Sequence, residues 1–278
     1  MAGNGWLHPV QSGQKPVGLD TTVAHPARIY DYWLGGKDNF AVDREAGEQA
    51  IAANPHIRPA VRINRAFLAR AVHYLADEAG IRQFLDIGTG LPSANNTHQV
   101  AQRVAPDSRI VYVDNDPIVL NHARALLTST PQGATAYLDA DMRDTAAVLG
   151  QAERTLDFSQ PVAVMLLAIL QLIPDADDPW AIVAQLMASV PPGSYLAICH
   201  PASDVQPEVM AEMARRLNDH MGPTQARFRT YAETSRFFDG LELVEPGIVQ
   251  PQQWRPGPGV TDIRNDVTAW CGVARKPA

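Results

Sequence analysis

Short apolar segments alternate with amphipathic ones through most of the chain, and this alternation leaves few possible folds. The segment at 161–169 is continuously apolar, which is typical of a central parallel strand covered on both faces. Strands that alternate with helices indicate a parallel sheet with right-handed crossovers. We therefore predict an α/β fold with a doubly wound, mostly parallel, seven-stranded sheet. The expected strands are 84–87, 109–113, 134–138, 161–169, 195–199, 241–245 and 267–274.

Helical periodicity and capping residues place the expected helices between these strands and before them. A short helix fits the first half of 26–40 and ends at Gly35-Gly36. Residues 1–20, rich in Gly, Pro and Gln, are expected to form a loose arm. We predict that residues 1–80 form an arm and a helical lid or extension, and that residues 81–278 form the sheet domain, within one structural unit. The other expected helices are 59–79, 93–104, 116–127, 144–149, 178–190, 207–221 and 233–238.

Charge and composition narrow the class of protein. The net charge of −7 argues against a broad nucleic-acid surface, which requires a basic footprint. No apolar segment approaches the roughly 20 residues of a membrane helix, and residues 1–10 lack the pattern of a signal peptide. We expect a cytoplasmic protein, monomeric or homodimeric, with reduced cysteines and no membrane or nucleic-acid partner. We also expect no metal, because the acidic cluster at 175–178 fits a loop and a helix cap.

The exit of the first expected strand carries the most informative motif, Asp86-Ile-Gly88-Thr89-Gly90. Ligands of open α/β sheets bind outside the carboxyl ends of the strands, and glycines there allow close approach to the backbone. A nicotinamide enzyme would need a third glycine near Ser93, and Asp86 would repel a pyrophosphate. A carboxylate instead suits the amino group and sulfonium of S-adenosylmethionine. The motif therefore favours S-adenosylmethionine over a dinucleotide.

The next strand exits supply further candidate ligands. Asp114, with Asn115 beside it, can accept hydrogen bonds from both hydroxyls of a ribose. Asp116 is interpreted as a helix N-cap. After the third expected strand, a carboxylate at Asp141 can accept from the adenine amino group, with Met142 packed on the ring. The fourth strand exit, around Ala168, is expected to wall the cofactor near its methyl group.

Several longer segments give the chain a family resemblance over nearly its whole length. They are 30–40, 64–67, 83–92, 111–117 and 236–246. The chain resembles the actinobacterial S-adenosyl methyltransferase family, formerly described as a domain of unknown function, and the wider class I methyltransferases from about 84 to 274. The resemblance implies a Rossmann-like fold and S-adenosylmethionine as cofactor, with S-adenosylhomocysteine as product. It implies no substrate. Relatives often carry His-Phe or His-His after the fourth strand, where this chain has Gln171-Leu172, so a catalytic histidine cannot be transferred there.

The segment Tyr30–Phe40 crowds aromatic, glycine and polar residues ahead of the sheet. Such an extension can lie over the cofactor and exclude water. We expect Lys37, Asn39, Asn64 or Arg65 to hold the methionine carboxylate. The complete set of predicted cofactor residues is Asp86, Gly88, Thr89, Gly90, Asp114, Asn115, Asp141, Met142, Ala168, Gly36, Asn39 and Arg65.

The expected reaction is in-line displacement at the sulfonium methyl by an acceptor that is a small molecule of unknown identity. The donor is already activated, so the protein mainly aligns the reactants and excludes water. His200 and Tyr32 are the candidate catalytic residues on the substrate side; His200 would be a general base for a hydroxyl acceptor. Two alternatives remain: a non-catalytic sensor that binds S-adenosylmethionine, and an NAD(P)-dependent oxidoreductase.

Overall fold

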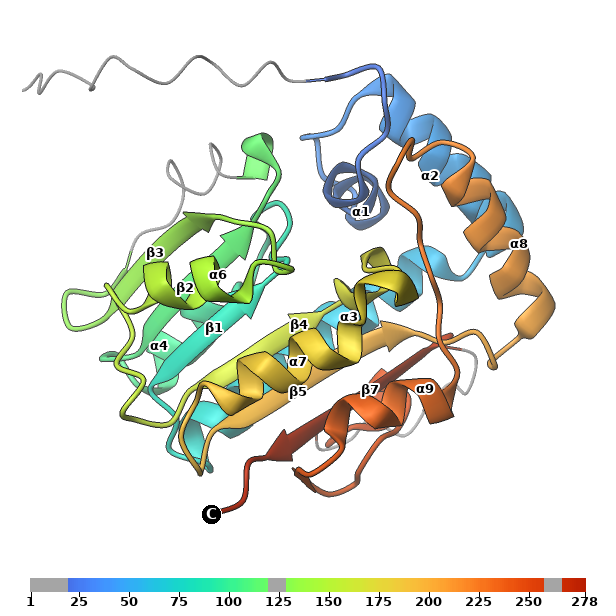
Figure 1. Ribbon diagram of the computed structural model, residues 1–278. Coiled ribbons are helices and arrows are strands. Elements are labelled where there is room, and N and C mark those ends of the chain that lie inside the picture. Colours follow the sequence, from blue (N-terminus) through green and yellow to red (C-terminus); the bar gives the residue numbers. More distant parts are fainter. Residues whose placement is uncertain (1–19, 120–128, 258–266) are drawn as a thin grey trace, which may run out of the picture.

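The computed structural model describes residues 20–119, 129–257 and 267–278 (Figure 1). Among these residues the strands form one seven-stranded sheet in the order β3-β2-β1-β4-β5-β7-β6. Strands β1 to β5 are parallel, and β7 runs antiparallel to both β5 and β6. The predicted mostly parallel α/β sheet is thus confirmed. The bounds are β1 Gln83–Ile87, β2 Arg109–Asp114, β3 Ala134–Asp139, β4 Ala163–Leu167, β5 Tyr195–Pro201, β6 Glu242–Leu243 and β7 Ala269–Arg275.

The helices between the strands agree with the periodicity of the sequence, and their ends are set by caps. Asp144 and Asp178 accept hydrogen bonds from backbone amides of the helices that follow them, and Gly35 ends the first helix with a φ of 87°. The described helices are α1 Pro26–Leu34, α2 Ala41–Ala53, α3 Ile57–Asp77, α4 Thr97–Val104, α6 Thr145–Ala152, α7 Pro179–Ala188, α8 Pro207–Asn218 and α9 Tyr231–Ser235. The short 3₁₀ turns in the described chain are η1 Leu170–Leu172, η2 Asp175–Asp177, η3 Arg236–Phe238 and η4 Pro251–Gln253.

The structure differs from the elements expected from the sequence most clearly at α2, α4 and β6. Helix α2 was not predicted, because its buried residues are mainly alanines and a glycine and give little amphipathic contrast. Helix α4 begins at Thr97 rather than at Ser93, because the Asn96 backbone is extended there. Strand β6 has two residues rather than five, because the chain turns away after Val244. Of the helix predicted at 116–127, residues 117–119 are helical and 120–128 lie outside the described residues, as does most of the predicted arm.

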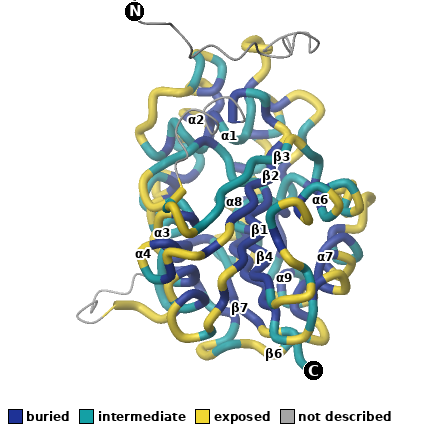
Figure 2. Tube along the Cα trace, turned by 90° about the vertical axis from the view of Figure 1, so that its left-hand side faces the viewer, coloured by how far each residue is buried: buried dark blue, intermediate teal, exposed yellow. Residues whose placement is uncertain are grey.

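Two apolar layers cover the two faces of the sheet, and Figure 2 shows the central strands as buried. One layer packs α6 and α7 on the sheet, and the other packs α3 and α4. A third cluster joins α1, α2 and α8. The long helix α3 contributes Val61 to that cluster and Phe67 to the layer on the sheet. Helix α3 therefore fixes the α1–α2–α8 group beside the carboxyl ends of the strands (Figure 1).

Buried Arg28 and Asp43 attach α1 to α2. Their side chains are almost completely buried, and Arg28 Nε lies 3.2 Å from Asp43 Oδ1. Asp43 also accepts hydrogen bonds from the backbone amides of His25 and Phe40. A buried charge that lost its partner would be costly, so this pair holds the two helices in one arrangement.

Candidate cofactor site

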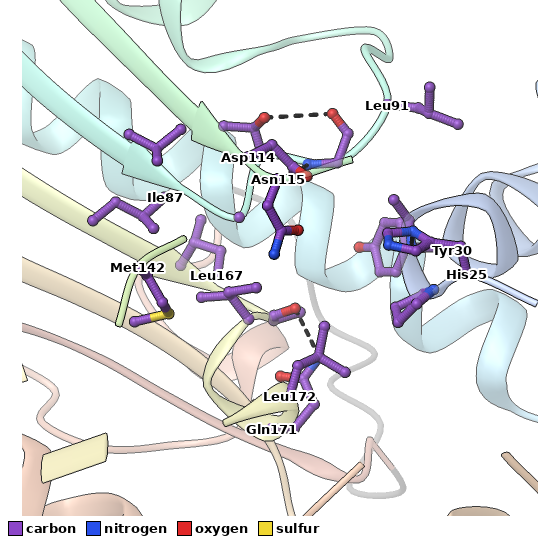
Figure 3. Close-up of a pocket in the computed structure, with 18 of the residues that line it drawn as sticks. His25, Tyr30, Ile87, Leu91, Asp114, Asn115, Met142, Leu167, Gln171 and Leu172 are labelled. Atoms are coloured by element: carbon purple, nitrogen blue, oxygen red, sulfur yellow. Dashed lines mark hydrogen bonds between the residues drawn. The ribbon is translucent and has the colours of Figure 1, made fainter. Parts of the chain in front are cut away.

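A cavity of about 440 Å³ lies where the exits of β1, β2, β3 and β4 meet helices α1 and α3 (Figure 3). This is the place where strand order reverses, since β2 and β4 flank β1 on opposite sides. Open α/β sheets bind ligands at such a point, and the volume is in the range of small-molecule sites. Ten predicted cofactor residues line this cavity: Arg65, Asp86, Gly88, Thr89, Gly90, Asp114, Asn115, Asp141, Met142 and Ala168.

The glycine turn after β1 is shaped by its neighbours on both sides. Gly88 and Gly90 have φ of 73° and 62°, a region that favours glycine. A Cβ on Gly88 would overlap the side chain of Ile169, which follows β4, whereas a Cβ on Gly90 would meet no atom. Ile169 therefore occupies the space beside the Gly88 Cα, whereas the space beside Gly90 is open to a ligand.

Asp86 is a buried carboxyl group at the base of this turn. Burial raises its pKa from 3.8 to about 6, although the Thr97 hydroxyl donates a hydrogen bond of 2.6 Å to Oδ2. The nearby Arg65 guanidinium offsets only part of this burial effect. A cationic ligand group beside Asp86 would stabilise the ionised carboxylate. The site is thus built to receive positive charge.

Asp114 links the exits of β1 and β2. Its Oδ2 accepts a hydrogen bond of 2.8 Å from the Gly90 amide, and its Oδ1 accepts one of 3.0 Å from the Asp116 amide. Burial is the main reason that the pKa of Asp114 is raised. Each carboxylate oxygen has a further lone pair, so both can still accept from ligand hydroxyls. Asp116 does not line the cavity; it accepts from the Ile118 amide, as an N-cap does, and lies 2.8 Å from His25 Nδ1.

The residues that follow β3 and β4 form two further walls of the cavity. Met142 is buried and presents an apolar surface, whereas Asp141 is engaged by Arg143, whose Nε lies 3.0 Å from Oδ1. This hydrogen bond is the main reason that the pKa of Asp141 is lowered. Ala168 has a φ of 62°, an uncommon conformation for a residue with a side chain. That conformation turns the chain sharply after β4 and brings Ile169 over Gly88.

Helices α1 and α3 bring further polar atoms to the cavity. Arg65 Nη2 donates to the Ala94 and Asn95 carbonyls at 3.2 and 3.1 Å, while its buried Nε has no hydrogen-bond partner among the described residues. Asn64 Nδ2 donates to the Tyr30 hydroxyl at 2.9 Å. Asn64 Oδ1 is then left buried and, within the described chain, unpartnered. A hydrogen-bond donor, Arg65 Nε, and an acceptor, Asn64 Oδ1, thus lie on neighbouring residues of α3 without a partner in the described chain.

Four predicted site residues do not line the cavity, and neither does Lys37. The Asn39 amide turns back to Asp31 Oδ2 at 2.8 Å and to the Gly36 carbonyl at 3.1 Å, which folds residues 36–39 onto α1. Tyr32 faces α2, where its hydroxyl bonds to Glu48. The structure therefore places Gly36, Asn39 and Tyr32 away from the cavity. The rotation of α1 turns Tyr32 toward α2, and the hydrogen bonds of Asn39 hold the segment after α1 against Asp31.

His200 is also not at the cavity. Its side chain is fully buried in β5, and its Nε2 lies 3.3 Å from Nη1 of buried Arg229. Burial and the Arg229 charge together hold the pKa of His200 well below its usual range. His200 is fully buried and does not line the cavity, so the structure does not support its predicted role as a general base for a substrate bound there.

Sequence reasoning missed parts of the cavity wall. His25, Tyr30, Asp31 and Leu34 reach it from the start and one face of α1. Their spacing along α1 is a helical signal that could have been recognised. Residues 223–225 reach the cavity from the loop after α8, and no local pattern in the sequence indicates this.

Comparisons with known proteins agree with this geometry. A family model described as S-adenosyl methyltransferase matches residues 12–277. The chain belongs to this S-adenosyl methyltransferase family. It is therefore an S-adenosylmethionine-dependent methyltransferase with an α/β fold, and the oxidoreductase alternative is set aside. No curated protein matches the chain significantly.

Solved structures give the same assignment. A DUF574 family protein from Streptomyces avermitilis is 48% identical, with a TM-score of 0.89 and coverage of 93% of this chain and 99% of that one. A protein from Thermobifida fusca assigned as a methyltransferase is 40% identical, with a TM-score of 0.86 and coverage of 95% and 98%. A plantazolicin methyltransferase in complex with S-adenosylhomocysteine shares the fold at 10% identity, with a TM-score of 0.54 and coverage of 91% and 96%.

In the described ranges, no group of three or more His, Cys, Asp or Glu side chains is placed to hold a metal ion. No helix among the described residues has the length and apolar character to cross a bilayer.

Proposed function

We propose that the cavity holds S-adenosylmethionine and that this family member transfers the methyl group to a small-molecule acceptor. The observation that carries the proposal is a set of buried polar atoms, on α3 and in the loop after β1, beside the glycine turn. Arg65 Nε, Asn64 Oδ1 and Ser93 Oγ line the same cavity, and none has a hydrogen-bond partner in the described chain. Unsatisfied buried polar atoms are costly, so they indicate a ligand that completes them.

The chemistry of these atoms matches the amino-acid end of the cofactor. Arg65 Nε is a donor and suits the carboxylate, whereas Asn64 Oδ1 and the Asp86 carboxylate are acceptors and suit the ammonium group. This division refines the sequence hypothesis, in which Asn64 was one of four candidates for the carboxylate. Asp114 would hold the ribose hydroxyls, and Met142 and Asn115 would border the adenine. Asp141 would reach the adenine amino group only in competition with Arg143.

When bound, the sulfonium supplies an electrophilic methyl group. The residues of the chain orient the two reactants and exclude water, which is most of what such a displacement requires. Gly88, with Ile169 packed on it, and the left-handed turn at Ala168 define the wall nearest the reaction. Helix α1 borders the cavity on the side away from the sheet, so it would act as a lid over the bound cofactor. The division into an extension before residue 81 and a sheet domain after it stays a prediction.

The remaining features are part of the same proposal. The cavity is of small-molecule size, and the net charge of −7 does not favour a nucleic-acid substrate. The two cysteines are buried and free although they lie opposite each other on β5 and β7, which fits a reducing cytoplasm. We expect a monomer or a homodimer.

Binding of cofactor fragments tests the proposed orientation. S-adenosylhomocysteine in excess should raise the unfolding temperature by several degrees, because a ligand at 100 times its Kd adds about 2.7 kcal/mol. NAD and NADP should have no effect. Arg65→Leu should weaken S-adenosylhomocysteine binding but spare 5′-methylthioadenosine, which lacks the amino-acid end.

Exposed Arg62 on the same helix provides the matched control. Arg62→Leu should bind both compounds like the wild-type chain. Equal losses for the two compounds in Arg65→Leu would contradict the proposed orientation, and stabilisation by NAD alone would refute the proposed function.

A further inference from the structure

The turn that follows β4 is held rigidly from the side away from the cavity. Arg229, whose side chain is fully buried, donates hydrogen bonds of 2.8 Å to the carbonyls of Leu170 and Ile173. Its charge is balanced by Asp175 Oδ1, also at 2.8 Å. The Arg227 amide donates to the Gln171 carbonyl at 2.7 Å. The backbone of η1 is therefore fixed before any ligand arrives.

Gln171 sits on this turn and lines the cavity, as Figure 3 shows. Its Nε2 donates a hydrogen bond of 2.7 Å to the Ala168 carbonyl. Only the amide nitrogen can donate to a carbonyl, so this bond fixes the orientation of the amide and leaves Oε1 as its other end. Gln171 Oε1 is buried and has no hydrogen-bond partner within the described ranges. It is a preorganised acceptor that needs a donor from a ligand.

Gln171 Oε1 belongs to the exit of β4, a different strand exit from those that carry the groups assigned to the amino-acid end and the ribose. The amino-acid end is satisfied by α3 and the exit of β1, and the ribose by the exit of β2. Gln171 follows β4, and the next residues along the cavity wall, Leu172, Ile173 and Pro174, are apolar except for their backbone. Thr224 and Gln225 also line the cavity, shortly before Arg227, whose amide bonds to the Gln171 carbonyl. An acceptor bound here would contact one buried amide oxygen beside the apolar residues 172–174.

We propose that Gln171 Oε1 binds an N–H of the methyl acceptor, and that the acceptor is a weakly basic amine on an apolar body. This inference rests on the proposed function. An amide oxygen accepts a hydrogen bond but does not take up a proton near neutral pH. A hydroxyl held this way would keep its proton and remain a poor nucleophile, whereas a neutral amine would still have its lone pair free. Residues 172–174 beside Gln171 carry no charged side chain, so they do not stabilise an ammonium form.

The reaction that follows is balanced without a base in the cavity. The nitrogen lone pair forms a bond to the methyl carbon, and the electrons of the carbon–sulfur bond move to sulfur, which becomes a neutral thioether. The nitrogen gains the positive charge that sulfur loses. The product then gives up its N–H proton to bulk water after it leaves. Gln171 is thus a specificity-determining residue that orients the lone pair.

Matched amines and alcohols test this proposal. The probes are aniline with phenol, and 5-aminoindane with 5-hydroxyindane, measured for binding to the chain saturated with S-adenosylhomocysteine and for turnover with S-adenosylmethionine. We expect an amine to bind and react at least about tenfold better than its matched alcohol. Gln171→Leu should reduce amine binding about tenfold or more, as expected for a lost buried hydrogen bond. Its affinity for S-adenosylhomocysteine should be unchanged.

Two further variants separate hydrogen bonding from packing. In Gln171→Glu, a protonated carboxyl group can donate to Ala168 and still accept from the amine, so amine binding should return as the pH is lowered. Gln132→Leu, an exposed change in the turn before β3, is the matched control and should have no effect.

The outcomes of these experiments distinguish a failure of the amine proposal from a failure of the cofactor assignment. Equal or better binding of the alcohols, no saturable amine binding, or undiminished amine binding by Gln171→Leu would overturn the proposal while the cofactor assignment stands. Failure of the wild-type chain to bind S-adenosylhomocysteine would instead refute the proposed function, and this inference with it.

Discussion

Replacement of Asp86 by asparagine should stabilise the ligand-free protein while it weakens the cofactor site. The Asp86 carboxyl is only 6% exposed, and its burial raises its pKa from 3.8 to about 6. The ionised form is therefore destabilised in the folded chain. Asparagine has nearly the same shape, carries no charge, and keeps an oxygen that can accept from Thr97.

The sign and size of the effect follow from proton linkage. The folded chain binds the Asp86 proton more tightly than the unfolded chain does, so stability falls as the pH rises from about 4 to about 6 and then levels off. A shift of roughly two pKa units corresponds to about 3 kcal/mol. We expect Asp86→Asn to be more stable than wild type by up to that amount above pH 6, and the two to be equal near pH 4. The unfolding temperature above pH 6 should then rise by roughly 5–10 °C.

Urea unfolding of both proteins without ligand, from pH 4 to 8, measures this difference. Asp107→Asn, at an exposed carboxyl near Arg82, is the control and should show no such pH-dependent gain. Titration with S-adenosylhomocysteine should show that Asp86→Asn binds less tightly. A variant that is less stable than wild type at pH 7.5, or a difference that does not change with pH, would refute the electrostatic reasoning.

Three other predictions follow from the same cavity. Asp114→Ala should weaken S-adenosylhomocysteine binding by roughly 1–3 kcal/mol in calorimetry, because charged hydrogen bonds are lost. Asp116→Ala should keep most of the affinity but lose about 1 kcal/mol of unfolding free energy, because a helix cap is lost. The reverse result would contradict the register of β2. Gly90→Ala should cost roughly 1–2 kcal/mol in urea unfolding from its backbone conformation alone. Gly88→Ala should cost a further 1–3 kcal/mol or so because its Cβ would overlap a neighbouring side chain, and equal costs would show that this close approach is unimportant. His200→Phe should leave S-adenosylhomocysteine affinity unchanged from pH 5 to 8, because the imidazole is neutral and outside the cavity; a lost pH-dependent step in affinity would restore His200 to the site.

The cavity walls at the exits of β1 and β2 could be predicted because they depend on local patterns. Asp86 and Asp114 end parallel strands, and parallel strands bring their carboxyl ends to one edge of the sheet, so position in the chain fixes position in space. Gly88 and Gly90 mark the turn for the same reason. Register alone was enough to place these residues.

The contribution of α1 to the cavity and the surroundings of His200 could not be predicted because they depend on contacts between distant segments. Tyr30 and Tyr32 are neighbours in an aromatic cluster, yet only the packing of α1 on α2 decides that Tyr30 faces the cavity. His200 stands at the end of β5, where a site residue is expected, but Arg229 reaches it from the loop after α8. Neither the rotation of a helix nor a long-range buried arginine leaves a periodic signal in the sequence.

The position of β7 has a consequence for how the protein is made. β7 lies between β5 and β6 in the sheet, although it comes after both in the chain. While the chain is synthesised, β5 therefore presents an unpaired edge until residues 269–275 emerge. Exposed edges of buried strands are templates for association with other chains. Substitutions in β7 should therefore change how strongly the chain depends on chaperones and how much of it aggregates during synthesis. This holds even though β7 contributes no residue to the cavity.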